Sequence, residues 1–334
     1  MQSRGIRLAV ASLAVLLAIA LTALVVGPSG VSAADVLALA SGAPIDPATA
    51  NILINIRFPR VAAALLAGGA LAVSGALIQA VLDNPLASPN IIGVNSGAGL
   101  AVLVVSALPV FAAEGHPGVL PVAAFAGALL ASAIMFLIAA RTGVSRLTVV
   151  LAGVALNAVF GAGTNTILAV APNIYVGSSS YLIGGFSGVL MSDLVAPAIL
   201  CALGFVAAMA LASHLNVLSL GASQAHAVGM PVEAVRIAAL AAAALLAGSA
   251  VSFAGLLGFV GLVVPHVVRR VAGSDCRWLI PLCAVWGAAF TCLCDTVARA
   301  AFAPYELPVG IILAFIGGPF FIYLIMRGRG YRDE

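Results

Sequence analysis

Three arginines of this 334-residue chain have neighbours and spacing that suit them to bind carboxylates. Arg57 and Arg60 lie on either side of Pro59, and Arg299 lies four residues after Asp295, close enough on a helix for that carboxylate to hold it in position. A guanidinium group takes a carboxylate through two parallel hydrogen bonds, so such arginines suit the docking of an acidic partner. The plain alternative for each is an arginine at a solvated helix end.

No comparable grouping supports catalysis. The sequence has no His-x-x-x-His pair, no Ser–Lys or paired-Asp arrangement and no Gly-x-x-x-x-Gly-Lys phosphate loop. The five cysteines have no metal-ligand spacing and are expected to act as small apolar residues: Cys201, Cys276, Cys283, Cys292 and Cys294. We therefore predict a non-enzymatic protein that itself binds no cofactor and no metal.

The composition explains where these residues must sit. Hydrophobic residues make up 63% of the chain and charged residues 7%, against roughly 25% charged in an ordinary soluble domain. Nine stretches of 17 or more residues carry no charge: 8–34, 61–82, 84–113, 115–140, 147–192, 194–232, 237–268, 278–294 and 307–326. Because a helical span needs about 20 apolar residues, the chain is predicted to be an all-α, multi-pass membrane protein. The composition excludes a soluble globule, a disordered chain and a nucleic-acid binder.

Clusters of Gly, Pro, Ser and Asn divide these stretches into ten predicted helices: 8–27, 58–82, 91–112, 118–140, 147–171, 190–212, 233–254, 256–270, 278–300 and 307–326. Residues 1–334 are taken as a single transmembrane domain. The first apolar run, of about 19 residues, exceeds the usual 7–15 of a signal peptide, so it is taken as the first span. Segments 28–56 and 172–189 are expected outside the spans, the second as a loop or surface helix.

Arginine placement predicts the orientation. Ten spans put both termini on one side, and placing them in the cytoplasm puts 11 of the 14 arginines on the inner side, as membrane proteins prefer. The three exceptions are Arg57, Arg60 and Arg299. Because they lie on the outer side, against the usual preference for inner arginines, they are candidates for an outer docking patch. Segments 28–56 and 172–189 then also lie outside.

A weak internal repeat has an offset of 180 residues. Ala67-Gly68, Gly75, Leu77, Leu82 and Pro85 recur as Ala247-Gly248, Gly255, Leu257, Leu262 and Pro265. The two copies lie in helices predicted to run in opposite directions, which is the pattern of an inverted repeat in transporters.

Three further features, on the inner side or inside a span, are candidates for partner binding, gating and pathway lining. Segment 213–231, the longest inner connection, is uncharged and moderately apolar, which suits a surface covered by a partner. The turn Asn84-Pro-Leu-Ala-Ser-Pro89 is either a rigid connection or a gate. Asn157, Thr164 and Asn165 form a polar strip on helix 147–171 and are predicted to line a pathway.

Several motifs resemble the permease family that imports iron chelates and vitamin B12. They follow one another from about residue 55 to 326: Arg57-Phe-Pro-Arg60, Gly69-Ala-Leu-Ala-Val-Ser-Gly75, Asn84-Pro-Leu-Ala-Ser-Pro89, Gly93-Val-Asn-Ser-Gly-Ala98, Leu151-Ala-Gly-Val-Ala-Leu156, Gly258-Phe-Val-Gly-Leu-Val-Val-Pro-His266, Asp295-Thr-Val-Ala-Arg299 and Glu306-Leu-Pro-Val-Gly310.

The resemblance implies a multi-pass subunit of the bacterial inner membrane that pairs with a second copy, with the pathway along the dimer axis. Two cytosolic ABC ATPases that use ATP and Mg²⁺ would dock beneath it, and a periplasmic substrate-binding protein would dock outside. The resemblance also implies the roles of individual residues. Arg57, Arg60 and Arg299 match the positions that receive the binding protein's glutamates.

Two inner sites are implied in the same way. The residues matching the ATPase-coupling region are Leu218, Leu220, Gly221, Ala222, Ala225 and Gly229, with Ala222 standing where many relatives carry an acid. Asn84 and Leu86 match one side of the cytoplasmic gate, and Ser145 and Arg146 match the other. The implied mechanism is alternating access driven by the partner's ATP hydrolysis.

The cargo is expected to be an iron chelate, haem or a ferric siderophore, with cobalamin as the alternative. A secondary transporter driven by ions belongs to another class and stays open. The lack of a carboxylate deep in any predicted span speaks against it.

Overall fold

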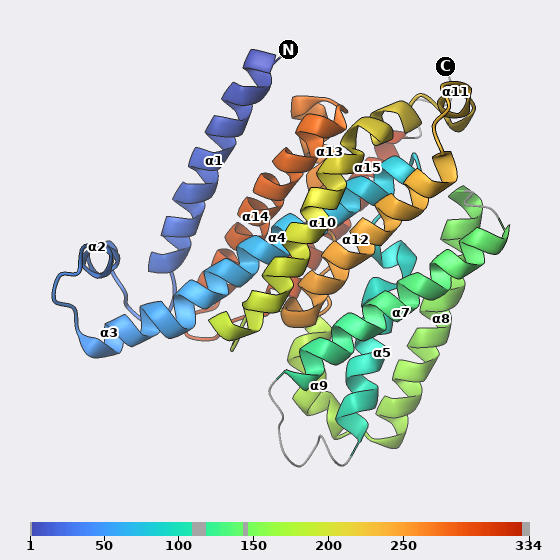
Figure 1. The fold of residues 1–334 in the computed structure, drawn as a ribbon. Coiled ribbons are helices and arrows are strands. Elements are labelled where there is room, and N and C mark those ends of the chain that lie inside the picture. Colours follow the sequence, from blue (N-terminus) through green and yellow to red (C-terminus); the bar gives the residue numbers. More distant parts are fainter. Residues whose placement is uncertain (1, 109–117, 143–145, 329–334) are drawn as a thin grey trace.

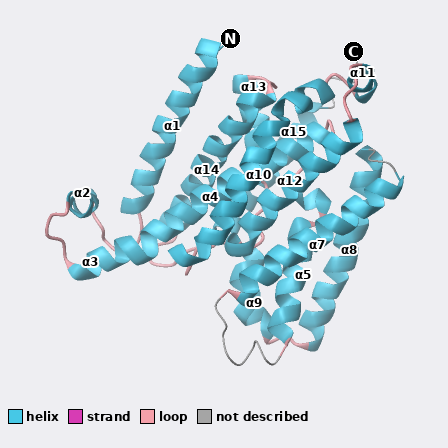
Figure 2. Cartoon of the chain, in the orientation of Figure 1, coloured by secondary structure: helices cyan, strands magenta, loops and turns pink. Residues whose placement is uncertain are grey.

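The computed structural model describes residues 2–108, 118–142 and 146–328, and all regular structure in these ranges is helical (Figure 2). The helices are α1 (Gln2–Val25), α2 (Ala33–Ser41), α3 (Pro47–Ile52), α4 (Phe58–Val81), α5 (Val94–Ala107), α7 (Val119–Thr142), α8 (Arg146–Val170), α9 (Ile174–Ile183), α10 (Met191–Leu218), α11 (Ala222–Ala227), α12 (Val232–Ala254), α13 (Val260–Ala272), α14 (Cys276–Ala300) and α15 (Val309–Gly328). A π-helical turn, Leu53–Arg57, joins α3 to α4, and a 3₁₀ turn, Pro89–Ile92, precedes α5.

Each of the ten predicted spans corresponds to a helix. Within the described residues, eight helical segments are long and apolar enough to cross a membrane, and the two remaining predicted spans are the shorter helices α5 and α13. Segment 172–189 contains a helix, α9, and segment 28–56 contains α2 and α3. Three boundaries differ by five or six residues. The helix predicted to begin at 8 begins as α1 at Gln2, and the helix predicted to end at 112 ends as α5 at Ala107. The helix predicted to end at 212 continues as α10 to Leu218, so the inner connection is shorter than expected.

The two ends of the bundle differ (Figure 1). The start of α1, the end of α15 and α11 lie at one end, while α2, α3 and α9 lie at the other. The first and the last described helices thus meet the same end, which agrees with an even number of spans. Following the predicted orientation, the end with the termini is called the inner end and the opposite one the outer end.

Helices α4 and α12 are the most deeply buried spans and run through the middle of the bundle in opposite directions (Figure 1). They also carry half of the residues of the predicted repeat. Ser74 on α4 donates a hydrogen bond to the carbonyl of Ala243 on α12, at 2.7 Å. This neutral polar contact adds to the close packing that holds helices together in lipid.

Glycines set how closely α4 approaches its other neighbours. A Cβ atom on Gly75 would lie 1.9 Å from the carbonyl oxygen of Gly261 on α13, and one on Gly68 would lie 2.2 Å from that of Gly287 on α14. Backbone therefore meets backbone at both crossings, as small residues allow in membrane bundles.

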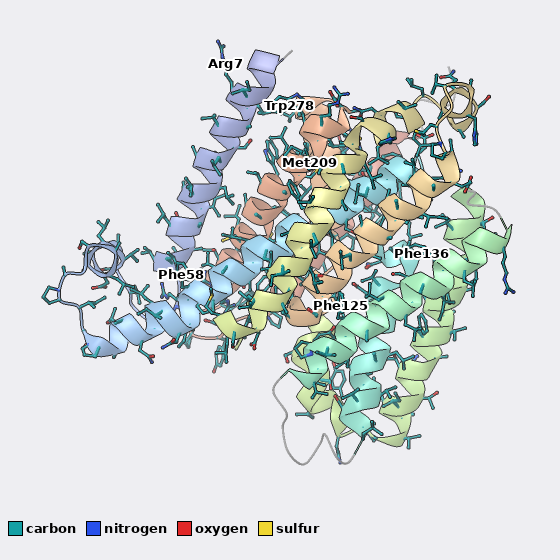
Figure 3. All side chains as sticks on the ribbon, in the orientation of Figure 1. Arg7, Phe58, Phe125, Phe136, Met209 and Trp278 are labelled. Carbon is teal, nitrogen blue, oxygen red and sulfur yellow. The ribbon has the colours of Figure 1, made fainter. Side chains whose placement is uncertain are left out.

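Helix α1 lies at the edge of the bundle and is one of its least buried spans (Figure 1). Near its inner end the Trp278 ring of α14 packs against Gly5 (Figure 3). Further along, the indole Nε1 of Trp286 donates to Ser12 Oγ at 2.8 Å. At its outer end α1 is held by arginines, described below.

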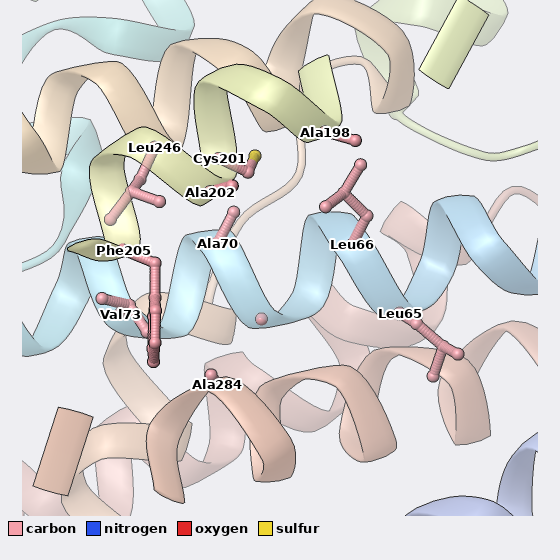
Figure 4. Close-up of a pocket in the computed structure, with 11 residues that line it drawn as sticks. Leu65, Leu66, Ala70, Val73, Ala198, Cys201, Ala202, Phe205, Leu246 and Ala284 are labelled. Atoms are coloured by element: carbon pink, nitrogen blue, oxygen red, sulfur yellow. The ribbon is translucent and has the colours of Figure 1, made fainter. Parts of the chain in front are cut away.

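The cysteines behave as the sequence predicts. All five are free and buried. Cys201 lines an apolar cavity of about 300 Å³ among aliphatic and aromatic side chains of α4, α10, α12 and α14 (Figure 4). Cysteine serves there as a small apolar residue.

Candidate functional site

The three arginines that the sequence singled out meet at the outer end, where α4 begins and α14 ends. Together with two carboxylates they form the outer arginine cluster, defined as Arg57, Arg60, Arg299, Asp295 and Glu306. The three guanidiniums and two carboxylates leave a formal charge of +1. The sequence thus singled out four of these five residues, including Asp295 beside Arg299, and Arg299 Nε lies 3.2 Å from Asp295 Oδ2.

Arg60 is surrounded by acceptors. Arg60 donates to the Asp295 carboxylate twice, from Nε to Oδ2 and from Nη2 to Oδ1, each at 3.0 Å. This ion pair is therefore bidentate, and it is buried. The remaining nitrogen of Arg60, Nη1, contacts Glu306 Oε2 at 2.5 Å and Ser187 Oγ at 3.4 Å. Charge-assisted bonds of this kind fix a guanidinium firmly in one geometry.

Arg57 and Arg299 hold the outer end of α1. Arg57 Nη1 donates to the carbonyls of Leu24 and Val25. Arg299 donates to the carbonyls of Ala23 and Val26, and both of these Arg299 bonds are 2.9 Å long. The last carbonyls of a helix lack partners within it and carry partial negative charge, so cations stabilise this end.

The three arginines are buried in the single chain. Arg57, Arg60 and Arg299 are only 3%, 6% and 3% exposed, because the end of α1 covers two of them and Glu306 and Asp295 enclose the third. A cavity of about 420 Å³ nevertheless reaches Arg60, between α9, the start of α7 and the loop before α15. Arg60 is therefore the arginine of the cluster that lines this cavity, together with Glu306.

At the inner end, the turn after α4 is held rigidly. The backbone N–H of Leu86 donates to Asn84 Oδ1 at 3.0 Å, and both side chains are half-buried. Leu86 packs beside Leu262 and Val263 of α13 and Leu324 of α15. Of the predicted facing residues, Ser145 lies outside the described residues and Arg146 marks the start of α8.

A buried glutamine ties this turn to α13. Gln79 Nε2 donates to the carbonyls of Ala87, at 3.1 Å, and Gly261, at 3.2 Å, and its Oε1 accepts from Arg269. The side chain is 2% exposed, so its polar atoms depend on these partners. Any movement of the turn relative to α13 has to break or re-form these bonds.

The polar strip on α8 divides into two parts. Asn157 faces α5, because its Oδ1 accepts from Ser96 Oγ at 2.5 Å and its Nδ2 donates to the carbonyl of Asn90 at 3.1 Å. Asn157 is half-buried, and its assignment to a pathway stays a prediction. Thr164 is half-buried and Asn165 is exposed, so Asn165 remains open to a pathway or a partner.

The inner segment between α10 and α12 presents a mixed surface. Leu218 and Ala225 are buried against the chain itself, so they are not available to a partner, and Ala222 is half-buried. Gly221 and Gly229 have φ of 110° and 80°, values that favour glycine. Leu220 and Val228, by contrast, are 65% and 72% exposed.

Asn216 anchors the base of this segment. Its Nδ2 donates to Asp275 Oδ1 at 2.6 Å, and its Oδ1 accepts from the N–H of Cys276 at 2.7 Å. The backbone N–H of Arg277 and the Asn216 amide lower the pKa of Asp275, because both donate to its charged form. The end of α10 is thereby fixed to the start of α14.

The sequence analysis missed three residues as site candidates. Glu306 stands within a family motif and Gln79 stands four residues after one. The signals that could have marked them were a carboxylate just before a span and an amide inside a span. Val228 had a weaker signal: it is an apolar residue in the connection that contains Gly221 and Gly229.

Comparisons with known proteins agree with this architecture. The model of the FecCD transport family matches residues 14–327. Over 296 residues the chain is 38% identical to the hemin transport system permease HmuU of Yersinia pestis, covering 85% of each chain. It is 40% identical over 301 residues to the cobalamin import system permease BtuC of Halobacterium salinarum, covering 89% of this chain and 80% of the relative. A solved metal-chelate type ABC transporter in an inward-facing conformation has a TM-score of 0.82 and 26% identity, covering 96% of this chain and 99% of that one.

Proposed function

The chain belongs to the FecCD transport family, and on this premise we propose that it is the transmembrane permease subunit of an ATP-binding-cassette importer. The observation that carries the proposal is that nearly the whole helical bundle matches a solved metal-chelate type ABC transporter. The permease carries out no covalent step. Its work is to bind partners at both ends and to open a pathway to each side in turn.

The second copy is proposed to cover α8 and α15. Among the spans, α8 is the least buried, and it exposes Leu151, Val154 and Val159. On α15, Phe315 and Met326 are more than two thirds exposed. These faces support a helix-to-helix dimer with a pathway between the copies, and the remaining apolar surface faces membrane lipid.

The two ends are proposed to bind different partners. At the inner end, which faces the cytoplasm, an ABC ATPase takes α11 and the exposed Leu220 and Val228. At the outer end a periplasmic substrate-binding protein meets the outer arginine cluster. When the ATPases bind ATP they move α11, and that movement reaches the turn at Asn84 through Gln79 and α13.

We propose an iron chelate as the cargo, either haem or a ferric siderophore. Relatives with 35% identity or more carry names for hemin, iron-hydroxamate and iron-citrate import. Cobalamin is the second candidate, because the cobalamin permease of Halobacterium salinarum is as similar as any of these.

Assembly with the ATPase tests the proposal. We expect Val228→Glu to weaken ATPase binding at least tenfold, because docking would bury an unpaired carboxylate. The measurement is co-purification of a tagged ATPase with the permease from membranes, at matched permease yields.

Val176→Glu is the matched control. Val176 is 81% exposed on α9 at the outer end, so the same change there should leave ATPase binding intact. Equal ATPase recovery with wild type, Val228→Glu and Leu220→Glu would show that this segment does not receive the ATPase.

A further inference from the structure

Arg60 has one permanent and one replaceable carboxylate. Asp295 is 1% exposed and holds Arg60 through two nitrogens from inside the bundle. The side chain of Glu306 is 32% exposed and contacts the third nitrogen, Nη1, from the loop between α14 and α15. Exposure therefore separates the two partners: water and other molecules reach Glu306 but not Asp295.

The replaceable contact borders open space. The cavity of about 420 Å³ at the outer end is lined by Arg60, Glu306, Ser187 and Asp193, among others. It has room for an incoming acidic side chain. The Nη1 nitrogen of Arg60 already contacts Glu306 and Ser187, however, and both of these residues line the cavity, so an acidic side chain that enters the cavity competes with Glu306 for this nitrogen.

The other two arginines offer no such position. Arg57 and Arg299 donate to carbonyls at the end of α1, and Gly27 lies against both guanidiniums. Freeing them requires the end of α1 to move. Freeing Arg60 requires only the rotation of one half-exposed side chain.

We propose that Glu306 is an internal substitute for the docking partner's carboxylate, so that docking exchanges one carboxylate for another on Arg60. The inference rests on the proposed function, because the incoming carboxylate belongs to the substrate-binding protein. In the undocked importer Glu306 keeps a buried guanidinium paired. On docking it swings into the cavity and the partner's acid replaces it. Glu306 therefore weakens docking and makes it readily reversible, which suits a carrier that has to leave after each delivery.

Glu306→Gln tests the exchange, because it keeps the shape and removes the charge. The full importer in lipid nanodiscs is titrated with its purified, cargo-loaded substrate-binding protein at low salt, and the dissociation constant is measured. We expect Glu306→Gln to tighten docking about tenfold or more, corresponding to roughly 1.4 kcal/mol of removed competition. Glu306→Asp retracts the carboxylate by one methylene and is expected to tighten docking as well.

Asp193→Asn is the matched control. Asp193 lines the same cavity and carries the same charge, but its carboxylate accepts from the N–H of Leu190 instead of from an arginine. If charge alone governs docking, Asp193→Asn and Glu306→Gln tighten it equally, and the exchange is refuted. Unchanged or weaker docking by Glu306→Gln also refutes it.

A second readout needs no partner. Phenylglyoxal modifies accessible guanidiniums, and peptide mass spectrometry resolves each arginine. We expect Glu306→Gln to speed modification of Arg60 and leave Arg57 and Arg299 unchanged; equal rates at Arg60 overturn the inference. If neither wild type nor Glu306→Gln binds the substrate-binding protein, the proposed function fails and the labelling result alone decides the role of Glu306.

Discussion

Gly75→Ala is expected to be among the most destabilising additions of a single methyl group to a span. The new Cβ would lie 1.9 Å from the carbonyl oxygen of Gly261, and a backbone atom cannot rotate away as a side chain can. Overpacking a well-packed core lowers the free energy of unfolding by roughly 1–3 kcal/mol. We expect Gly75→Ala to reach or exceed the upper end of this range, because α13 has to move as a whole to relieve the contact. The measurement is the melting temperature in detergent, followed by size-exclusion chromatography. We expect a fall of roughly 5–10 °C, with reduced yield.

Gly177→Ala is the control for this change. Gly177 also lies in a helix, but a Cβ there meets nothing within 4 Å. Alanine favours helix by about 1 kcal/mol over glycine, so the control should melt at the same temperature or slightly higher. Equal melting temperatures for Gly75→Ala and wild type would show that α4 and α13 are further apart than described here.

Asp295→Asn is expected to cost about 3–5 kcal/mol, the range for removing one partner of a buried ion pair. Asp295 is 1% exposed and serves both Arg60 and Arg299, so its neutralisation leaves two buried guanidiniums without their shared carboxylate. The same melting assay measures the loss. The amide keeps the size of the side chain, so the effect reports charge and not a cavity.

Glu233→Gln gives the comparison for an exposed pair. Glu233 contacts Arg236 at 3.3 Å and its side chain is 55% exposed, so its loss should cost no more than about 1 kcal/mol. If Asp295→Asn is as harmless as Glu233→Gln, the outer arginine cluster is solvated in the membrane-embedded protein and its described burial is wrong.

The spans were predictable because charge is excluded from lipid, and uncharged stretches report that directly. The end of α10 was not predictable from the sequence. The sequence after residue 212 contains Ser213, His214 and Asn216, which suggested a loop, yet Leu215 and Leu218 are buried and continue the helix. Asn216 is satisfied by Asp275 and Cys276, about 60 residues further along the chain, and local composition cannot report that contact.

The outer arginine cluster shows the same limit. Its members were identified from their charge and their side of the membrane, which single positions reveal. Their burial could not be predicted in this way, because it depends on two contacts that are distant in sequence. The end of α1 lies 32 residues from Arg57, and Glu306 lies 246 residues from Arg60. The partners of Asn157 could not be predicted for the same reason, since Ser96 and Asn90 are distant in sequence.

Transport in proteoliposomes tests the central claim most directly. The permease is reconstituted with its ABC ATPase and substrate-binding protein, and uptake of haem, a ferric hydroxamate and cobalamin is measured in parallel. We predict uptake of one of these that requires ATP and disappears with an ATPase unable to hydrolyse it. Uptake that proceeds under an ion gradient with this chain alone would contradict the account.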